Sequence, residues 1–432
     1  MVVKLDTAPP RGMKDLLPPE VELRDQASAT ILTTYKRYGF RRVETPALEN
    51  LKLLLGSGGG ENEKLIYKVL KRGAKLDAAT TREEDLADLG LRFDLTVPLA
   101  RYYAHNRATL PDPFKAIQIG PVWRAERPQK GRFRQFIQCD IDILGVASEI
   151  AEIELILATS QALVALGLEQ PRIRLNDRRV LSAMASHCGV DATRHGEFFI
   201  ILDKLDKIGR EGVERELREA GYDEGAIGKL FELFLSADDS PEDRLERLAR
   251  TVPAAAGAAD GLRTIVRAVA REAGDRTSIE FDPSLVRGMG YYTGPIFEAV
   301  YGGGTSAIAG GGRYDRMVGR LLGNDVPACG FSIGFERVVS ILEERAGGGG
   351  APRERIAFLF DRADPMTDVV TSAGRLRSGD RVVSPTLKRK NLAKQLDDLA
   401  GEGFGSYSVF RADSAVEIKP LARRAGGGGS DA

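Results

Sequence analysis

The sequence predicts an α+β fold, with a helical insertion inside the main domain and a small α/β domain near the C-terminus. Segments typical of strands and helices fill residues 1–170 and resume at 276–345. Between them, residues 171–275 contain charged helical patterns with alanine-rich connections and without the glycine clusters found on either side. We therefore expect one domain built from the two outer segments and interrupted by a helical one.

Four consecutive glycines at 347–350 separate a second domain from the first. A glycine run of this kind is typical of a flexible linker, which we place at 346–352. Beyond it, residues 353–420 alternate between strand and helix patterns in the manner of a small α/β domain. The glycine-rich end, residues 421–432, is expected to be disordered.

Local signals support individual elements of the main domain. Residues 17–38 have the pattern of an amphipathic helix, and residues 150–167 carry apolar side chains at helical spacing. Residues 92–105 run from a short strand pattern into another helix. In the insertion, Ser240 followed by Pro241 is a helix start signal, because a hydroxyl N-cap precedes a proline at the first helical position.

Composition excludes several classes of protein. Lysine plus arginine balance aspartate plus glutamate at 62 each, so any contact with nucleic acid must come from a local basic patch. The three cysteines form no CxxC pair, which argues against a zinc site or a disulfide framework. The N-terminus lacks the apolar core of a signal peptide, and no run of about 18 apolar residues occurs. We expect a cytoplasmic protein without a membrane span.

The most informative stretch is WRAERPQKGRFRQFIQCDIDILG, residues 123–145. A basic segment leads into a strand pattern, 132–144, whose side chains alternate between two faces. One face carries Ile137, Cys139, Ile141 and Ile143, and the other carries Arg132, Arg134, Phe136, Gln138, Asp140 and Asp142. A solvated strand face would also alternate. Two arginines, an aromatic ring, a glutamine and two acids together favour a binding site, in which arginine suits polyphosphate and the basic loop suits an RNA backbone.

This stretch resembles motif 2 of the class II aminoacyl-tRNA synthetases, in the form found in the histidyl-tRNA synthetase family. Other signatures of that family follow in the right order over residues 9–345. They are PRGMKDLLP (10–18), GFRRVETPALEN (39–50, motif 1, with Pro46 at the dimer-interface position), RFDLTVPLARY (92–102), LVRGMGYYTGPIFE (285–298), AGGGRYD (309–315) and GFSIGFERV (330–338, motif 3). The resemblance implies a catalytic domain built on an antiparallel sheet flanked by helices, and more loosely an anticodon-binding-like domain, shortened, at 353–420.

The resemblance also implies an ATP site. Arg124 would hold the α-phosphate, Phe136 would stack on adenine, and Arg337 would cover the other adenine face or the γ-phosphate, with Arg132 also at the nucleotide. Arg287 would bridge the amino-acid carboxylate and the α-phosphate, so that Arg124, Arg287 and Arg337 are the candidate catalytic residues. Mg²⁺ would accompany the β- and γ-phosphates, and no protein metal ligand is predicted.

The histidine subsite implied by the resemblance contains two groups of residues. Asp94, Thr96 and Gln138 would take the ammonium group of L-histidine. Asp142 and Tyr292, with Tyr291 beside them, would hold the imidazole, and the subsite also includes Arg124 and Arg287. An acid facing the ring would discriminate against apolar amino acids, which would leave that carboxylate buried and unpaired.

The implied partners are tRNA(His) and a second copy of the chain. Gln129 and Lys130 are candidates for contact with the acceptor end of the tRNA. The segment 386–395 has the pattern of the basic start of a helix. The resemblance makes its residues Lys388, Arg389 and Lys390 candidates for contact with the anticodon, although a solvated helix end would look the same.

Two other functions fit the pattern less well. A regulatory paralogue, such as the synthetase-like subunit of ATP phosphoribosyltransferase, would sense histidine without charging tRNA, but such proteins generally lose the catalytic arginines and the C-terminal domain. The second is an activating enzyme that passes the aminoacyl group to an acceptor other than tRNA, which the shortened C-terminal domain makes possible. One residue departs from the family pattern: Gly290 stands where aspartate is common, which alters the hydrogen bonding available around Tyr291 and Tyr292.

Overall fold

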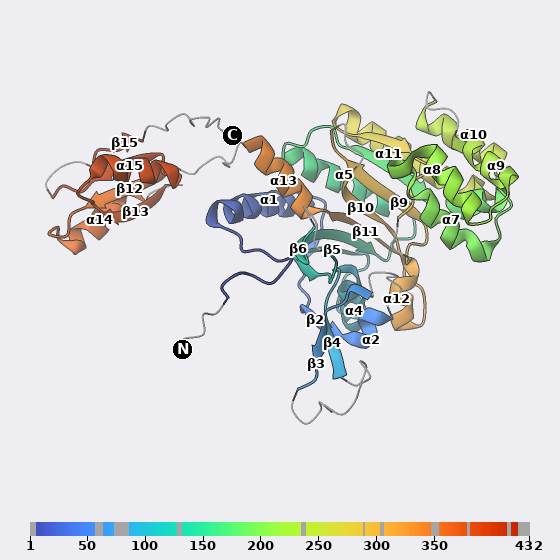
Figure 1. Ribbon diagram of the computed structural model, residues 1–432, viewed down its shortest axis with the longest axis horizontal. Helices are drawn as coiled ribbons and strands as arrows, with labels where there is room; N and C mark the ends of the chain where they lie inside the picture. Colours follow the sequence, from blue (N-terminus) through green and yellow to red (C-terminus); the bar gives the residue numbers. More distant parts are fainter. Residues whose placement is uncertain are drawn as a thin grey trace. The chain divides into compact units, whose positions relative to one another are not determined.

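The computed structural model describes residues 6–56, 64–72, 86–127, 132–234, 239–287, 290–302, 306–346, 354–377, 381–412 and 416–421. The chain forms two compact units, Met1–Leu342 and Glu343–Ala432. Each unit has its own sheet and core, and each is described here by itself (Figure 1).

The first unit is built on an eight-stranded sheet in the order β1-β5-β6-β11-β10-β9-β7-β8. All neighbours are antiparallel except the pairs β1–β5 and β7–β8. The strands are β1 (Arg41–Arg42), β5 (Phe114–Trp123), β6 (Gln135–Leu144), β7 (Arg172–Asp177), β8 (Ser278–Phe281), β9 (Pro295–Val300), β10 (Ala307–Arg313) and β11 (Ala328–Ile333). The expected α+β fold on an antiparallel sheet is therefore confirmed.

Helices from three parts of the chain cover one face of this sheet (Figure 1). Ile31 and Tyr35 of α1 and Leu155 of α5 share a fully buried cluster with Ile141 of β6 and Leu262 of α11. Burying a side chain of this size stabilises the fold by about 1.5–3 kcal/mol. The covering helices are α1 (Pro18–Arg37), α5 (Ile150–Ala165), α10 (Pro241–Thr251), α11 (Ala256–Ala273) and α13 (Phe335–Ala346).

The opposite side carries a smaller layer, a three-stranded antiparallel sheet with short helices. Its core joins Phe93 and Val97 to Phe114 and Leu144 at the ends of β5 and β6, and to Tyr314. The elements are β2 (Leu48–Asn50), β3 (Lys68–Leu70), β4 (Ala87–Leu91), α2 (Leu51–Leu55), α4 (Thr96–Asn106) and α12 (Asp315–Leu322). This layer places the residues that precede α4 against the large sheet.

Segment 171–275 is mostly helical, but it does not begin with a helix. Its first residues form β7, which pairs with β8 and β9 in the large sheet. The helices α6 (Arg178–His187), α7 (His195–Leu202), α8 (Leu205–Glu219) and α9 (Glu224–Phe234) follow, and Phe198 and Leu230 lie in a buried cluster with Val286. The start signal of α10 is confirmed, since Ser240 accepts a hydrogen bond from the Asp243 amide at 3.2 Å.

The second unit is a four-stranded sheet in the order β13-β12-β14-β15, with the first three strands parallel. Its elements are β12 (Arg355–Phe360), α14 (Met366–Leu376), β13 (Val382–Leu387), α15 (Leu392–Gly401), β14 (Ser406–Val409) and β15 (Lys419–Pro420). The helix expected to open at 386 begins only at Leu392, because Asn391 caps it by accepting from the Lys394 amide. Lys388, Arg389 and Lys390 therefore lie in the loop between β13 and α15.

No helix among the described residues is long and apolar enough to cross a membrane. The linker expected at 346–352 and the tail expected at 421–432 fall almost entirely outside those residues.

A buried ion pair joins β10 to α5. Arg313 donates from Nε and Nη2 to the two carboxylate oxygens of Glu152 at 2.6 and 2.9 Å, and the two side chains are 8% and 1% exposed. We expect Glu152→Ala to lower the free energy of unfolding by about 3–5 kcal/mol, because the guanidinium is left buried without its anion.

Urea unfolding measures this effect. The matched control is Glu246→Ala, which breaks an ion pair to Arg250 whose side chains are 48% and 75% exposed, and which should cost less than about 1 kcal/mol. An equal fall in the free energy of unfolding in the two variants would contradict the assignment of the Glu152–Arg313 pair to the core.

Candidate active site

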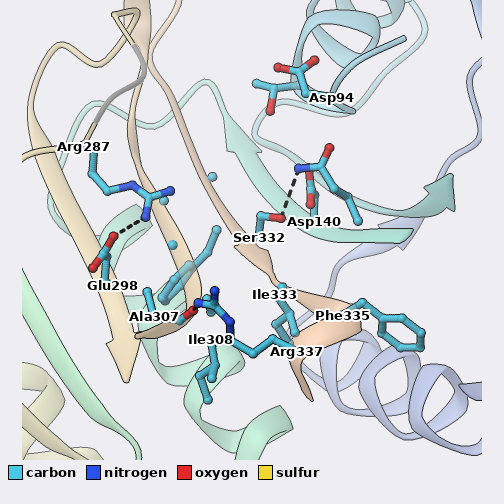
Figure 2. Close-up of a pocket in the computed structure, with 18 of the residues that line it drawn as sticks. Asp94, Asp140, Arg287, Glu298, Ala307, Ile308, Ser332, Ile333, Phe335 and Arg337 are labelled. Carbon is cyan, nitrogen blue, oxygen red and sulfur yellow. Dashed lines mark hydrogen bonds and ion pairs between the residues drawn. The ribbon is translucent and has the colours of Figure 1, made fainter. Parts of the chain in front are cut away.

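The first unit has a cavity of about 630 Å³ on its large sheet. Strands β6, β10 and β11 form its floor, and loops before α4 and before β9 form its walls (Figure 2). The polar lining side chains are Asp94, Thr96, Arg124, Glu126, Arg132, Gln138, Asp140, Asp142, Lys207, Arg287, Tyr291, Tyr292, Glu298, Tyr314, Ser332, Glu336 and Arg337.

Alternation along β6 explains why acids line this cavity. Gln138, Asp140 and Asp142 face the cavity, whereas Cys139 and Ile141 lie in the core beneath the covering helices. The expected division of the two faces is therefore confirmed from Phe136 onward. The strand itself begins at Gln135, so that Arg132 and Arg134, which the sequence placed on it, precede it.

Three carboxylates are buried in the cavity, and each has one oxygen without a hydrogen-bond partner among the described residues. Asp94, Asp140 and Asp142 are 1%, 3% and 2% exposed. Asp94 Oδ1 accepts from the Val97 amide at 3.1 Å, and Asp142 Oδ1 accepts from the Tyr314 hydroxyl at 2.5 Å. Asp94 Oδ2, Asp140 Oδ1 and Asp142 Oδ2 have no hydrogen-bond partner within the described part of the chain. Buried acceptors without a donor are costly, and a donor-rich ligand would satisfy all three.

Burial raises the pKa values of these acids. The pKa of Asp94 rises to about 6 and that of Asp142 to about 7, in both cases mainly through loss of solvation. Burial and then the neighbouring Asp142 hold the pKa of Asp140 well above its usual range. The Arg124 guanidinium opposes these shifts at Asp94 and Asp140. Clustered acids with raised pKa values are typical of a functional site, and here they favour a cationic ligand.

Glycines of β10 and β11 give the acids and arginines room. A Cβ on Gly330 would overlap Asp142 Oδ1, and a Cβ on Gly310 would overlap the Arg287 guanidinium. The glycine-rich signatures of the sequence therefore have a steric explanation, because two charged side chains lie directly over backbone.

Arginines occupy other parts of the cavity. Arg124, immediately after β5, donates from Nε to the Phe93 carbonyl at 3.0 Å and lies over the Phe136 ring, 5.1 Å from its centre. Arg287 pairs with Glu298, and its Nε has no partner among the described residues. Arg337, at the start of α13, donates to the Ala307 carbonyl. Figure 2 shows Arg287 and Arg337 apart from Asp94 and Asp140.

The cavity brings together all the residues expected for histidine and ATP. Tyr291 and Tyr292 pack edge to face, 4.9 Å between ring centres. Arg132 also lines the cavity, although it is exposed and pairs with Glu126 at 3.2 Å.

The residues expected to contact tRNA lie outside this cavity or outside the described residues. Gln129 and Lys130 lie outside the described residues. In the second unit, Lys388 pairs with Asp361 at 3.0 Å and Arg389 with Asp398 at 2.7 Å, while Lys390 is exposed.

Sequence reasoning left out several polar residues that line the cavity, and three of them bear directly on its charges. Asp140 was placed on the correct strand face without being assigned to the site, although its alternation with Gln138 and Asp142 was sufficient to include it. Tyr314 lies inside the AGGGRYD signature and binds Asp142. Glu298 had no sequence signal, because its role comes from its pairing with Arg287.

Comparisons with known proteins agree on one family. Residues 12–338 match the family model for histidyl-tRNA synthetase. The histidine–tRNA ligase of Leifsonia xyli subsp. xyli is 47% identical over 428 residues, which cover 96% of this chain and 98% of that protein. The crystal structure of histidyl-tRNA synthetase from Nostoc sp. PCC 7120 is similar with a TM-score of 0.81 and 28% identity, covering 97% of this chain and 95% of that one.

A third similarity concerns fold alone. The crystal structure titled ATP phosphoribosyltransferase regulatory subunit/histidyl-tRNA synthetase from Bacillus halodurans C has a TM-score of 0.76 at 19% identity, covering 95% of this chain and all of that one. At this identity the likeness does not distinguish a catalyst from a regulatory subunit.

The raised pKa of Asp142 predicts a pH-dependent stability. Between its usual value of 3.8 and about 7, the folded state keeps a proton that the unfolded state has lost, so the free energy of unfolding falls as pH rises through this window. Asp142→Asn removes this titration. Without ligand, we expect the variant to be more stable than the wild type by about 1–4 kcal/mol at pH 8, with the difference shrinking toward pH 4.

Urea unfolding at pH 4, 6 and 8 measures the difference. The matched control is Asp88→Asn, which removes an exposed acid of β4 in the same unit. A variant that is less stable than the wild type at pH 8 would show that Asp142 is not a strained, uncompensated acid.

Proposed function

The chain belongs to the histidyl-tRNA synthetase family, and from this membership and the chemistry of its cavity we infer that it is a histidine–tRNA ligase, a class II aminoacyl-tRNA synthetase. It activates L-histidine with ATP to histidyl-adenylate and transfers the histidyl group to the 3′ end of tRNA(His). One observation carries the assignment of the cavity: buried carboxylates with unused acceptors and several arginines line the same site.

The ammonium group of histidine binds at Asp94, with Thr96 and Gln138 beside it. The unpartnered oxygens Asp94 Oδ2 and Gln138 Oε1 support this role, because an ammonium group supplies several donors.

The imidazole binds at Asp142 and the tyrosine pair Tyr291 and Tyr292. Tyr314 holds one oxygen of Asp142 and leaves the other free for a ring N–H. An apolar amino acid of similar size would leave that acid desolvated and without a donor. The free energy cost of this unpaired carboxylate, and not size alone, therefore discriminates against such an amino acid.

Adenylation brings two anions together. A carboxylate oxygen of histidine forms a bond to the α-phosphorus, while the bond from that phosphorus to the bridging oxygen of the β-phosphate breaks and pyrophosphate leaves with the electron pair. Arg124 holds the α-phosphate, and Arg287 lies between it and the amino-acid carboxylate. Fixed guanidinium groups offset the repulsion and stabilise the charge of the transition state.

The nucleotide is held by Phe136 under the adenine, with Arg132 and Arg337 toward the ring or the outer phosphates. Arg124, which covers Phe136 here, moves toward phosphate when ATP enters. No group of three or more metal-binding side chains occurs among the described residues. Mg²⁺ therefore enters as part of the substrate MgATP, bound mainly by phosphate oxygens.

The remaining assignments rest on family membership. The 3′-terminal ribose hydroxyl of the tRNA attacks the carbonyl carbon of the adenylate and releases AMP. Gln129 and Lys130 contact the acceptor end, and Lys388, Arg389 and Lys390 contact the anticodon. The protein acts as a homodimer whose interface includes residues 39–50, a segment in which Leu48 is 40% exposed. It acts in the cytoplasm.

Exchange and charging assays test the function. Purified protein with histidine, ATP and labelled pyrophosphate should give histidine-dependent exchange, and total tRNA offered each amino acid in turn should be charged with histidine. Absence of exchange would indicate a regulatory paralogue, against which the three catalytic arginines argue. Exchange without charging would indicate a different acceptor.

Arg287→Ala should lower the rate of histidine-dependent exchange by a factor on the order of 100 or more, because it removes positive charge from the reacting anions. The matched control is Arg267→Ala, which removes an arginine that is 65% exposed and paired with Glu242. Circular dichroism checks that both variants fold. Near-normal exchange by the Arg287 variant would remove that residue from its role.

A further inference from the structure

We propose that Asp140 is a further specificity-determining residue of the histidine subsite, which binds the ammonium group of the substrate together with Asp94. This inference rests on the proposed function of the cavity and adds a residue to it. The family signatures assign roles to Gln138 and Asp142 on either side of Asp140 and none to Asp140 itself.

The side chain of Asp140 has the properties of a ligand-binding group and not of a core residue. It is 3% exposed, it lines the cavity, and its Oδ1 has no hydrogen-bond partner within the described ranges. Ser332 lies directly opposite Asp140 across β11 and β6, and its hydroxyl, which accepts from Gln138 Nε2 at 3.5 Å, opposes the rise in the pKa of Asp140. Asp140 and Ser332 therefore lie side by side on the cavity floor (Figure 2), and Asp140 Oδ1 is left for a ligand to satisfy.

The neighbours of Asp140 show which end of histidine it meets. Arg124 opposes the rise in the pKa of both Asp94 and Asp140, whereas the side chain that binds Asp142 is the Tyr314 hydroxyl. Since Arg124 holds the α-phosphate, the amino-acid carboxylate must lie on its side of the subsite. The ammonium group is one carbon away from that carboxylate, so it lies near Asp94 and Asp140 and the ring lies near Asp142 and Tyr314.

Charge complementarity supports the same assignment. No cation forms an ion pair with Asp94, Asp140 or Asp142 among the described residues, whereas Arg287 and Arg132 already have Glu298 and Glu126. An ammonium group has three donors, and Asp94 Oδ2 and Asp140 Oδ1 are two unsatisfied acceptors on neighbouring elements. A charged hydrogen bond to each would discriminate strongly against ligands that lack the amino group.

The experiment compares Asp140→Asn with the wild type in pyrophosphate exchange and inhibition. Asparagine keeps the volume and an acceptor for Ser332 but removes the charge. We expect KM for histidine to rise about 10- to 100-fold and KM for ATP to change less than about 3-fold. Asp88→Asn, which neutralises an exposed acid on β4, should change neither.

Two inhibitors separate ligand contact from a general effect on the cavity. Histidinol keeps the ammonium and imidazole groups, and imidazolepropionic acid lacks the ammonium group. Asp140→Asn should weaken histidinol about as much as histidine and leave imidazolepropionic acid within about 3-fold of the wild type. Equal weakening of both inhibitors, or weakening of neither, would overturn the proposal.

The outcomes for the two proposals are distinct. A wild-type protein without histidine-dependent exchange would refute the proposed function, whereas an active wild type with an unselective Asp140→Asn variant would refute only the role of Asp140. Asp140→Ser, which also removes the charge and is smaller, should give the same selectivity if the asparagine variant fails to fold.

Discussion

The burial of three carboxylates on one floor, without a paired cation, is the constraint on which the rest of this site depends. Asp94, Asp140 and Asp142 are almost completely buried, and each keeps one oxygen without a partner among the described residues. Such an arrangement is unfavourable in the empty protein. It persists because the surrounding sheet, with its core of fully buried apolar side chains, is stable enough to hold it. These unpaired carboxylates lower the stability of the empty protein, and a cationic ligand that pairs with them removes that cost when it binds.

Neighbouring strands supply the space and the orientation that these acids need. Gly330 of β11 lies under Asp142, and Gly310 of β10 lies under Arg287, so that charged side chains can rest on backbone. The Tyr314 hydroxyl fixes Asp142, and the Val97 amide fixes Asp94. These two acids are therefore each held through one oxygen and present the other, which is the geometry expected of a preorganised site.

The sequence predicted this region well because its signals are local. Alternation along β6 assigns side chains to faces without knowledge of the fold, and helix caps such as Ser240 depend on a few neighbouring residues. Prediction failed where the cause lies elsewhere in the chain. Strand β7 opens a segment of helical composition because β8 and β9 pair with it, and Glu298 belongs to the site because Arg287, 11 positions before it, needs an anion. Asp140 was missed for a different reason, since motif reasoning assigns only residues that a motif names.

The separation of charges within the cavity explains how one site can serve both substrates. Arg287 and Arg337 lie apart from Asp94 and Asp140 (Figure 2). Arg124 opposes the rise in the pKa of Asp94 and Asp140 and lies over Phe136. A histidine molecule carries its ammonium and carboxylate on one carbon, so it can satisfy the acids only by directing its carboxylate toward the arginines. In the site that we propose, binding of the amino acid aligns the nucleophile with the phosphate, and the groups that select histidine also orient it for reaction.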